Sequence, residues 1–304
     1  MTAITAFKCP DGLVMAAETE ESYADNKVYT YKLFPGERPG KSRFCVAGAG
    51  LGYLIDHARD RIVSAIDSGI KNTVQFEFRL AEILDGLYKK EFRHFPVESP
   101  VDLRIQLLVG AQFISESDPA VWLEPTLYEC RSNLVISFKN PTRRSCVLGA
   151  GELLKETAVQ FAGWGLSVEL AEWVSVYLIH EAKRRFGGVG GRTHIFTMRN
   201  DGTFSHDLGK NTREREGILE GFSRATQLFM LSLEPSVPKN RAADLIDAGT
   251  RWLKDARRAL QKIEAGTEKP KHASIEIRSR EIEKMFRRMR LATPLASQKS
   301  EPEP

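Results

Sequence analysis

The stretch that decides the fold is residues 2–18, TAITAFKCPDGLVMAAE. Residues 4–8 are short and partly alternating, and residues 13–17 form a continuous apolar run, so both segments are typical of strands. The residues between them, Cys9-Pro10-Asp11-Gly12, carry the chemistry of a tight turn. The sequence therefore predicts a β-hairpin at the N-terminus.

The order of elements that follows this hairpin predicts the fold class. Apolar residues recur at three- and four-residue steps in four segments, which predicts helices at 53–66, 76–92, 152–161 and 168–186. We expect further strands at 28–34, 44–47, 103–113, 122–128, 134–138, 146–148, 192–198 and 203–206. A loop is expected at 35–40, and a hairpin turn at Asn200-Asp201-Gly202. Paired helices between groups of antiparallel strands indicate an α+β protein of stacked sheets covered by helices, not a parallel βαβ fold.

The chain of 304 residues divides into a body and an extension. The pattern of apolar residues changes beyond Ser236, where they form one helical stripe within 242–263 and another within 282–289. We assign residues 1–235 to the main domain, 236–292 to a helical C-terminal extension and 293–304 to a disordered tail.

Composition excludes several classes of protein. With 42% hydrophobic and 28% charged residues the chain is typical of globular proteins, and it has no apolar run of the ~20 residues that a membrane span needs. Four scattered cysteines without a CxxC motif indicate a reducing, cytoplasmic setting. The formal charge is +4, and the excess of basic residues lies in residues 241–304. Such a mild excess predicts neither a nucleic-acid nor a membrane partner.

Familiar cofactor and metal motifs are missing from the sequence. His180-Glu181 begins like HExxH, but Arg184 stands where the second histidine would be. Two glycine-rich turns, at 46–52 and 147–152, begin like a dinucleotide fingerprint, but each lacks the third glycine. They are better explained as tight strand-to-helix turns. We therefore expect no cofactor and no metal.

The N-terminus itself is the strongest candidate for chemistry. Thr2 follows the initiator Met1, and a small second residue permits removal of that methionine. The exposed α-amine, with an ordinary pKa of about 7.7–8.0, would be a base within reach of the Thr2 hydroxyl. The alternative is an ordinary processed terminus without a catalytic role.

The same residues carry a resemblance to a known family. Residues 2–7 followed by 11–18 resemble the opening of proteasome β subunits, with Glu18 at the spacing of the catalytic acid. The strand around Lys32 resembles the one that bears the family's lysine, one residue earlier than usual. Residues 46–50 resemble the stretch whose glycine amide forms the oxyanion hole, and 182–191 resemble the family's helix end and double glycine. The likeness covers residues 2–210 and implies an N-terminal-nucleophile hydrolase with a four-layer αββα sandwich.

The resemblance also implies roles for single residues. Thr2 would attack a peptide carbonyl, Lys32 would favour its alkoxide, and Glu18 would keep Lys32 charged and oriented. The amide of Gly48 would stabilise the oxyanion. The backbone of Ser22 would align the substrate, while the first substrate pocket would be lined by Thr30, Val46 and Gly50.

Three positions depart from the family pattern. Phe186 and Val189 stand where the family places an aspartate and a serine that hydrogen-bond to the threonine amine, and Glu152 stands where it places another serine. One hypothesis is that Glu152 supplies the carboxylate lost at position 186. The other is that the site is degenerate.

The sequence thus predicts a cytoplasmic threonine-type endopeptidase of the proteasome type that acts on peptides or proteins. The resemblance further implies self-association in a homo-oligomeric ring or ring-like assembly. Two alternatives stay open: a scaffold subunit that has lost its chemistry, and an amidohydrolase or peptide ligase with another acyl acceptor, because the acylation machinery is shared.

Overall fold

The computed structural model describes residues 2–23, 26–91, 105–131, 134–138, 144–149, 151–233 and 237–264. The chain divides into two compact units, 1–216 and 217–304. This division falls within a helix, α5 (Lys210–Ser232), and the boundary predicted from the sequence lies at residue 235.

One antiparallel sheet of the first unit is built around the N-terminal hairpin. Its strands, in spatial order, are β10 (Ser145–Leu148), β1 (Ile4–Cys9), β2 (Gly12–Glu18), β11 (Thr193–Arg199) and β12 (Phe204–Asp207). The predicted turn is confirmed, because Cys9 pairs with Gly12. Its Asp11 carboxylate accepts a hydrogen bond of 3.0 Å from the amide of Val168, which begins a helix, so the turn also caps that helix.

The second sheet, also antiparallel, lies against the first. Its strands, in spatial order, are β5 (Leu33–Arg38), β6 (Ser42–Ala49), β7 (Gln106–Phe113), β8 (Thr126–Arg131) and β9 (Leu134–Ser137). A separate two-stranded ribbon, β3 (Glu20–Tyr23) and β4 (Asn26–Tyr29), connects the two sheets along the chain.

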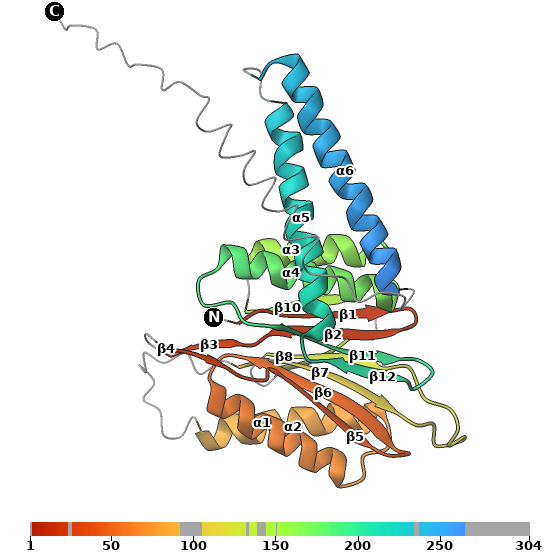
Figure 1. The fold of residues 1–304 in the computed structure, drawn as a ribbon. Coiled ribbons are helices and arrows are strands. Elements are labelled where there is room, and N and C mark those ends of the chain that lie inside the picture. Colours follow the sequence, from red (N-terminus) through yellow and green to blue (C-terminus); the bar gives the residue numbers. More distant parts are fainter. Residues whose placement is uncertain are drawn as a thin grey trace, which may run out of the picture. The chain divides into compact units, whose positions relative to one another are not determined.

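Two pairs of helices cover the outer faces of the sheets (Figure 1). Helices α1 (Gly52–Asp67) and α2 (Thr73–Glu91) pack on the second sheet, whereas α3 (Glu152–Ala162) and α4 (Val168–Arg185) pack on the first. One apolar cluster fills the space between α1, α2 and their sheet, and another fills the space between the two sheets. The expected α+β class is confirmed, with the helices and sheets in the expected layers.

The segment 28–38 differs from expectation. Residues 35–40 were expected to form a loop because of their prolines and glycines, but β5 runs through Pro35 to Arg38. This strand lies at the edge of its sheet, where a proline that lacks an N–H is tolerated. Gly36 lies under the ring of Phe44 on β6, and a Cβ there would be 2.1 Å from that ring. The strand expected at 28–34 is instead divided between β4 and β5.

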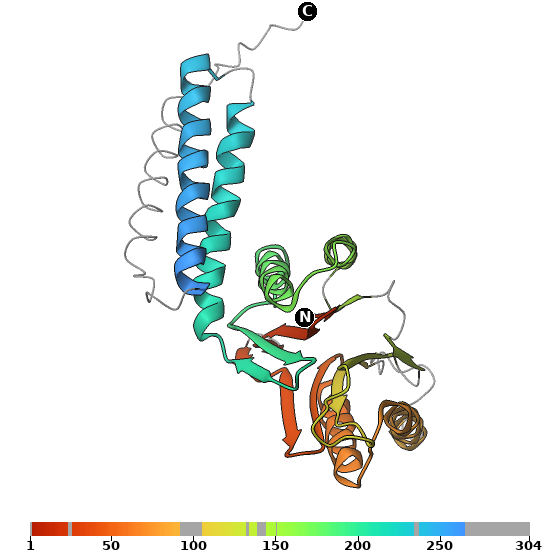
Figure 2. The ribbon, with the colours of Figure 1, turned by 90° about the vertical axis from the view of Figure 1, so that its right-hand side faces the viewer.

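The second unit contains the end of α5 and helix α6 (Lys239–Glu264), which run side by side (Figures 1 and 2). Glycines allow this close packing, because a Cβ on Gly221 would be 1.5 Å from the Trp252 ring and one on Gly249 would be 2.8 Å from Phe229. The expected stripe at 242–263 lies on α6, while the stripe at 282–289 and the tail 293–304 lie outside the described residues.

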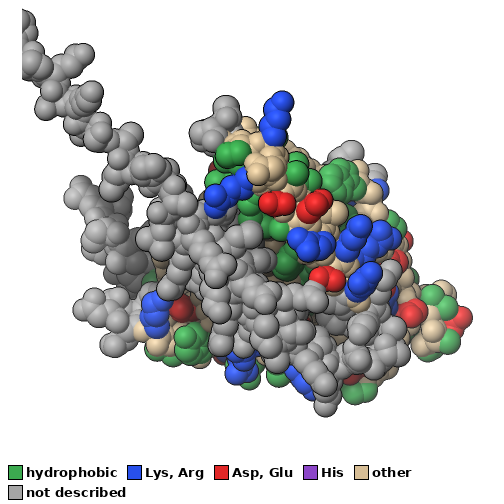
Figure 3. Space-filling model, turned by 45° about the horizontal axis from the view of Figure 1, so that its top comes forward, with side chains coloured by type: hydrophobic (Ala, Val, Ile, Leu, Met, Phe, Trp, Pro, Cys, Tyr) green, Lys and Arg blue, Asp and Glu red, His purple; other side chains and the backbone are tan. Residues whose placement is uncertain are grey.

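Surface properties agree with the composition. Among the described residues, no helix is both long and apolar enough to cross a membrane. Lys and Arg side chains lie next to Asp and Glu side chains on the face shown in Figure 3. The described surface of that face therefore carries both signs of charge.

Candidate active site

Thr2 lies just before β1, between two neighbouring strands of the first sheet. Strand β1 pairs with β10 through Ile4 and Leu148, and with β2 through Ile4 and Ala17. Gly149, the residue after β10, lies against the carbonyl oxygen of Thr2, and a Cβ on Gly149 would be 1.9 Å from that oxygen. Thr2 itself is half-buried. These contacts position Thr2 on the sheet.

A buried carboxylate and a buried ammonium group lie beside Thr2. Glu18, the last residue of β2, is fully buried, and Lys32 is 4% exposed. The amides of Ala3 and Glu20 donate hydrogen bonds of 3.2 and 2.7 Å to the two oxygens of the Glu18 carboxylate. Lys32 Nζ donates to Glu18 Oε1 and, at 2.5 Å, to the carbonyl of Glu20. A buried ion pair needs such additional hydrogen bonds to offset the loss of hydration.

The third contact of Lys32 connects this pair to the candidate nucleophile. Its Nζ donates a hydrogen bond of 3.4 Å to Thr2 Oγ. An ammonium group at that position favours an alkoxide over a neutral hydroxyl, since the Coulomb attraction is strong where water is excluded. The three side chains that sequence reasoning grouped as Thr2, Glu18 and Lys32 are therefore brought together in one cluster.

The two candidate glycines lie at different places around the end of β6. Gly48 is buried within the strand and pairs with Leu107, and a Cβ there would meet the side chains of Ile55 and Leu107. Gly50 follows the strand, is exposed and has φ +122°. Only a glycine adopts that conformation readily, so Gly50 makes the turn into α1.

Thr30 and Ser22, both expected to contact the substrate, lie in different parts of the structure. Thr30 is half-buried and lines a hollow of about 440 Å³ together with Thr19, Tyr31 and His194. Burial, and then the neighbouring His206, lower the pKa of His194, so this hollow gains no positive charge from it at neutral pH. Ser22 pairs with Lys27 in the ribbon of β3 and β4.

The expectation for Val46 is wrong. Val46 is fully buried, and its side chain belongs to the apolar cluster between α1, α2 and the second sheet. It therefore cannot line a pocket that a substrate reaches. The reason is the pleat of β6, because successive side chains of a strand point to opposite faces.

Glu152 is not brought into the cluster. It begins α3, its side chain is 73% exposed, and its carboxylate pairs with Lys155 at 3.0 Å. The position expected to have lost a carboxylate, Phe186, is half-buried, and its ring lies 3.1 Å from the Cβ position of Gly151. Val189 is buried.

We therefore expect Glu152→Ala to leave peptide hydrolysis within about twofold of wild type, since surface substitutions have small effects. The measurement is the initial rate of cleavage of a fluorogenic peptide at pH 7.5, with Glu156→Ala on the same helix as the matched control. A loss of activity comparable to that of a Glu18 variant would instead restore the hypothesis that Glu152 replaces the missing carboxylate.

Sequence reasoning missed two further contributions to the site. The amide and the carbonyl of Glu20 hold Glu18 and Lys32, respectively. Gly149 was recognised only as a turn glycine, although its φ of +74° and its contact with Thr2 make it part of the site. Backbone groups leave no signature in residue types, so no signal in the sequence indicates the role of Glu20.

The contact between Gly149 and Thr2 gives a second prediction. In Gly149→Ala, the new Cβ would overlap the Thr2 carbonyl oxygen, and the residue would have to keep a left-handed conformation. We expect a lower Tm and at least a tenfold loss of peptide hydrolysis, because displacing a nucleophile by ~1 Å can cost about a hundredfold in rate. Gly40→Ala is the matched control, since Gly40 also has positive φ (66°) but no atoms within 4 Å of its Cβ position. Equal activity of the two variants would contradict this account.

Comparisons with known proteins define the class of fold. The search against protein-family models and the search of curated proteins found no match. Solved structures do match, and they identify the fold of this chain as proteasome-like, as the resemblance implied.

The similar structures are those of Anbu, the ancestral β-subunit. Anbu from Yersinia bercovieri matches with a TM-score of 0.62 and 13% identity over 78% of this chain and 99% of its own. A Gly-1 mutant of Anbu from Hyphomicrobium sp. strain MC1 matches with a TM-score of 0.60 and 15% identity, covering 78% and 100%. Anbu from Pseudomonas aeruginosa, solved as a helical assembly, matches with a TM-score of 0.61 and 18% identity, covering 78% and 98%. At these identities the likeness concerns the fold alone.

Proposed function

We propose that the protein is a threonine-type endopeptidase that uses Thr2 as its nucleophile after removal of Met1. The observation that carries this proposal is the position of Lys32 Nζ, which donates hydrogen bonds to both Thr2 Oγ and the buried Glu18. Burying an ammonium group costs free energy, so a lysine without a role is usually found at the surface. The burial of Lys32 beside the Thr2 hydroxyl therefore favours a role in the reaction. The proteasome-like fold supports the same assignment.

The proposed acylation step uses the groups of Thr2 itself. Thr2 Oγ attacks the carbonyl carbon of the scissile peptide, while its proton passes to the free α-amine of Thr2, directly or through water. Lys32 stabilises the negative charge on the attacking oxygen, and Glu18 keeps Lys32 charged and in place. The C–N bond then breaks, the proton goes to the leaving amine, and an ester on Thr2 Oγ remains. Water hydrolyses this ester and regenerates the hydroxyl.

The oxyanion of the tetrahedral intermediate needs a backbone donor. The glycine-rich segment at the end of β6 has backbone amides that could serve. We propose the amide of Gly48 as the donor. Gly50 is the alternative, since it lies in the turn rather than in the strand ladder. One such donor is typically worth about 10²–10³ in rate. No step of this mechanism uses a cofactor or a metal.

Substrates would be peptides or proteins that present an extended segment to the site. The hollow beside Thr30 would receive one side chain, and the backbone of Ser22 in β3 would align the chain. We also propose that the protein self-associates in a ring-like or helical assembly, because Anbu from Pseudomonas aeruginosa forms a helical one.

The test is cleavage of a pool of internally quenched peptides by the purified full-length chain, followed by mass analysis of the products. We expect new amino termini within the peptides, at a rate that falls when the enzyme's own α-amine is acetylated. Failure to cleave any peptide of the pool, with Met1 removed, would contradict the proposal.

A second candidate function is a scaffold subunit without chemistry. Phe186 favours this candidate, because an aromatic ring packs near Gly151 at the position where the family resemblance leads one to expect a carboxylate. The two candidates differ in one observable, the reactivity of Thr2, which a scaffold does not need.

A further inference from the structure

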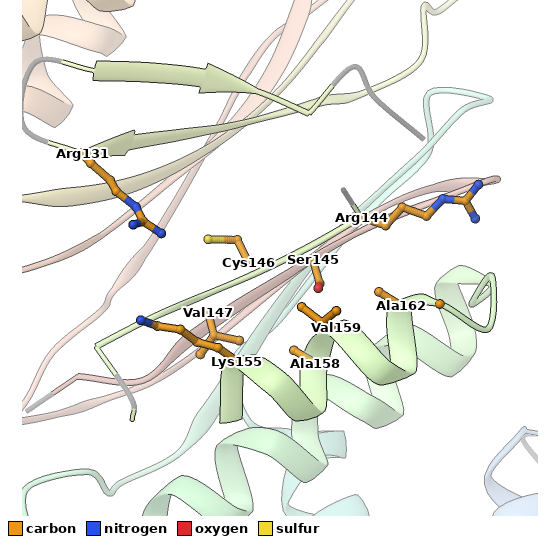
Figure 4. A pocket seen from close by; sticks show the side chains of 10 residues that line it. Arg131, Arg144, Ser145, Cys146, Val147, Lys155, Ala158, Val159 and Ala162 are labelled. Atoms are coloured by element: carbon orange, nitrogen blue, oxygen red, sulfur yellow. The ribbon is translucent and has the colours of Figure 1, made fainter. Parts of the chain in front are cut away.

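The free edge of β10 adjoins a hollow of about 690 Å³ that the mechanism above does not use. The hollow lies between β10 and α3, and its walls include Val159 and Ala162 of that helix (Figure 4). Because β10 pairs only with β1, its other side has no partner strand among the described residues. The hollow therefore borders a strip of strand backbone beside an apolar wall, with Ser145 half-buried and Val147 buried.

The pairing of β10 shows which backbone groups face the hollow. The amide of Lys8 donates to the carbonyl of Arg144 at 2.8 Å, and the register continues from Phe7 opposite Ser145 to Ile4 opposite Leu148. In an antiparallel ladder the residues that face the partner strand alternate with those that face away. Ser145 and Val147 therefore direct their N–H and C=O groups to the free edge, and both residues line the hollow.

The side chains around the hollow favour an anionic ligand. Three described lining residues are basic, Arg131, Arg144 and Lys155, whereas none is acidic. Figure 4 shows the cationic ends of Arg131 and Lys155 together at one end of the hollow, with Arg144 directed away from them. Arg131 pairs with the fully buried Glu129, and Lys155 pairs with the exposed Glu152. The guanidinium of Arg131 is half exposed, so its other N–H groups remain accessible.

This hollow is next to the proposed nucleophile. Its lining residue Val147 lies two positions before Gly149, which contacts the carbonyl of Thr2. Figure 4 shows Lys155 beside Val147, and at ~3.3 Å per residue of strand Val147 is about 7 Å from Gly149, so the charged end of the hollow lies on the side of Thr2.

We propose that the hollow binds an extended acidic peptide segment as an additional strand on the edge of β10. Main-chain hydrogen bonds to Ser145 and Val147 give affinity, and Arg131 and Lys155 select carboxylate side chains. As a statement about the enzyme's substrates it rests on the proposed function. It then assigns a class of substrate, polypeptides with acidic residues close to the cleaved bond.

The test is binding to the full chain carrying Thr2→Ala, so that the peptide is not consumed. The probe is a fluorescein-labelled peptide of alternating Glu and Val, six residues long, and its counterpart has Lys in place of Glu. We expect anisotropy to report binding of the acidic peptide only, weakened by added salt. In Arg131→Gln/Lys155→Gln, the Kd should rise at least about tenfold.

A matched control distinguishes the loss of cations at the hollow from a decrease in the overall positive charge of the protein. Arg79→Gln/Lys89→Gln removes two cations from α2, whose own partners are Glu82 and Asp85, and it should change the Kd by less than about twofold. A further variant, Ser145→Pro, removes one outward N–H at an edge position where proline is tolerated, and should also weaken binding. Equal binding of the two peptides, no binding of either, unchanged binding by the Arg131/Lys155 variant, or pairing of β10 with a second copy in place of the peptide would overturn the proposal.

The outcome is independent of whether Thr2 is reactive. Modification of Thr2 by a β-lactone without binding of the acidic peptide would overturn the proposed peptide site in the hollow and support Thr2 as the nucleophile. Binding of the acidic peptide to a protein whose Thr2 is inert would overturn the proposed nucleophile and support the peptide site in the hollow.

Discussion

Replacing Thr2 by valine is expected to abolish peptide hydrolysis, with the rate falling to the background of the assay. Valine keeps the shape of threonine and the free α-amine but has no hydroxyl, so the proposed acyl-enzyme cannot form. The half-buried position of Thr2 and its contact with Gly149 are compatible with this isosteric change. The measurement is cleavage of a fluorogenic peptide at enzyme concentrations high enough to detect a loss of about 10⁴-fold.

Thr2→Ser is the matched control, because serine keeps both the hydroxyl and the α-amine. It should retain measurable hydrolysis, and mass analysis should show removal of Met1 from both variants. Hydrolysis by Thr2→Val at the wild-type rate would show that another residue is the nucleophile.

Replacing Lys32 by methionine is expected to lower the rate of Thr2 modification and of hydrolysis by about a hundredfold or more. Methionine has a similar length without the charge, so Thr2 Oγ loses the cation that favours its alkoxide. The variant also leaves Glu18 buried without its ammonium partner, and breaking such a pair typically costs about 3–5 kcal/mol of stability. The Tm must therefore be measured beside the rate.

A double variant separates catalysis from stability. In Lys32→Met/Glu18→Gln the buried charge is removed together with its partner, so much of the lost stability should return while hydrolysis stays low. Lys32→Arg keeps the positive charge but changes its geometry, and its rate of hydrolysis should lie between those of wild type and Lys32→Met. A return of activity in the double variant would mean that Lys32 serves folding and not the reaction.

Much of the fold could be predicted because the apolar patterns are strong. The hairpin at 2–18 and the helices beginning near Gly52, Glu152 and Val168 lie where residue periodicity placed them. The edge strand through Pro35 was missed, since local turn residues indicated a loop and only its place in the sheet makes the proline acceptable. Helix α5 was missed because its first half is charged and contains Gly217, so it lacks a clear apolar stripe.

The site could be predicted to the extent that it depends on residue types. Thr2, Glu18 and Lys32 are far apart in sequence, and their spacing resembled that of a known family before the structure brought them together. The choice of Val46 was wrong because the pleat of its strand directs the side chain into the core. The contributions of Glu20 and Gly149 depend on backbone groups and on close approach, which a sequence does not display.

The reactivity of Thr2 can be measured as the intact mass of the protein after incubation with a β-lactone, followed by peptide mapping. We expect loss of Met1 and one adduct per chain, located on Thr2, with none in Thr2→Val. A protein that has lost Met1 and remains unlabelled would contradict it, and would favour a scaffold in which Thr2, Glu18 and Lys32 no longer perform chemistry.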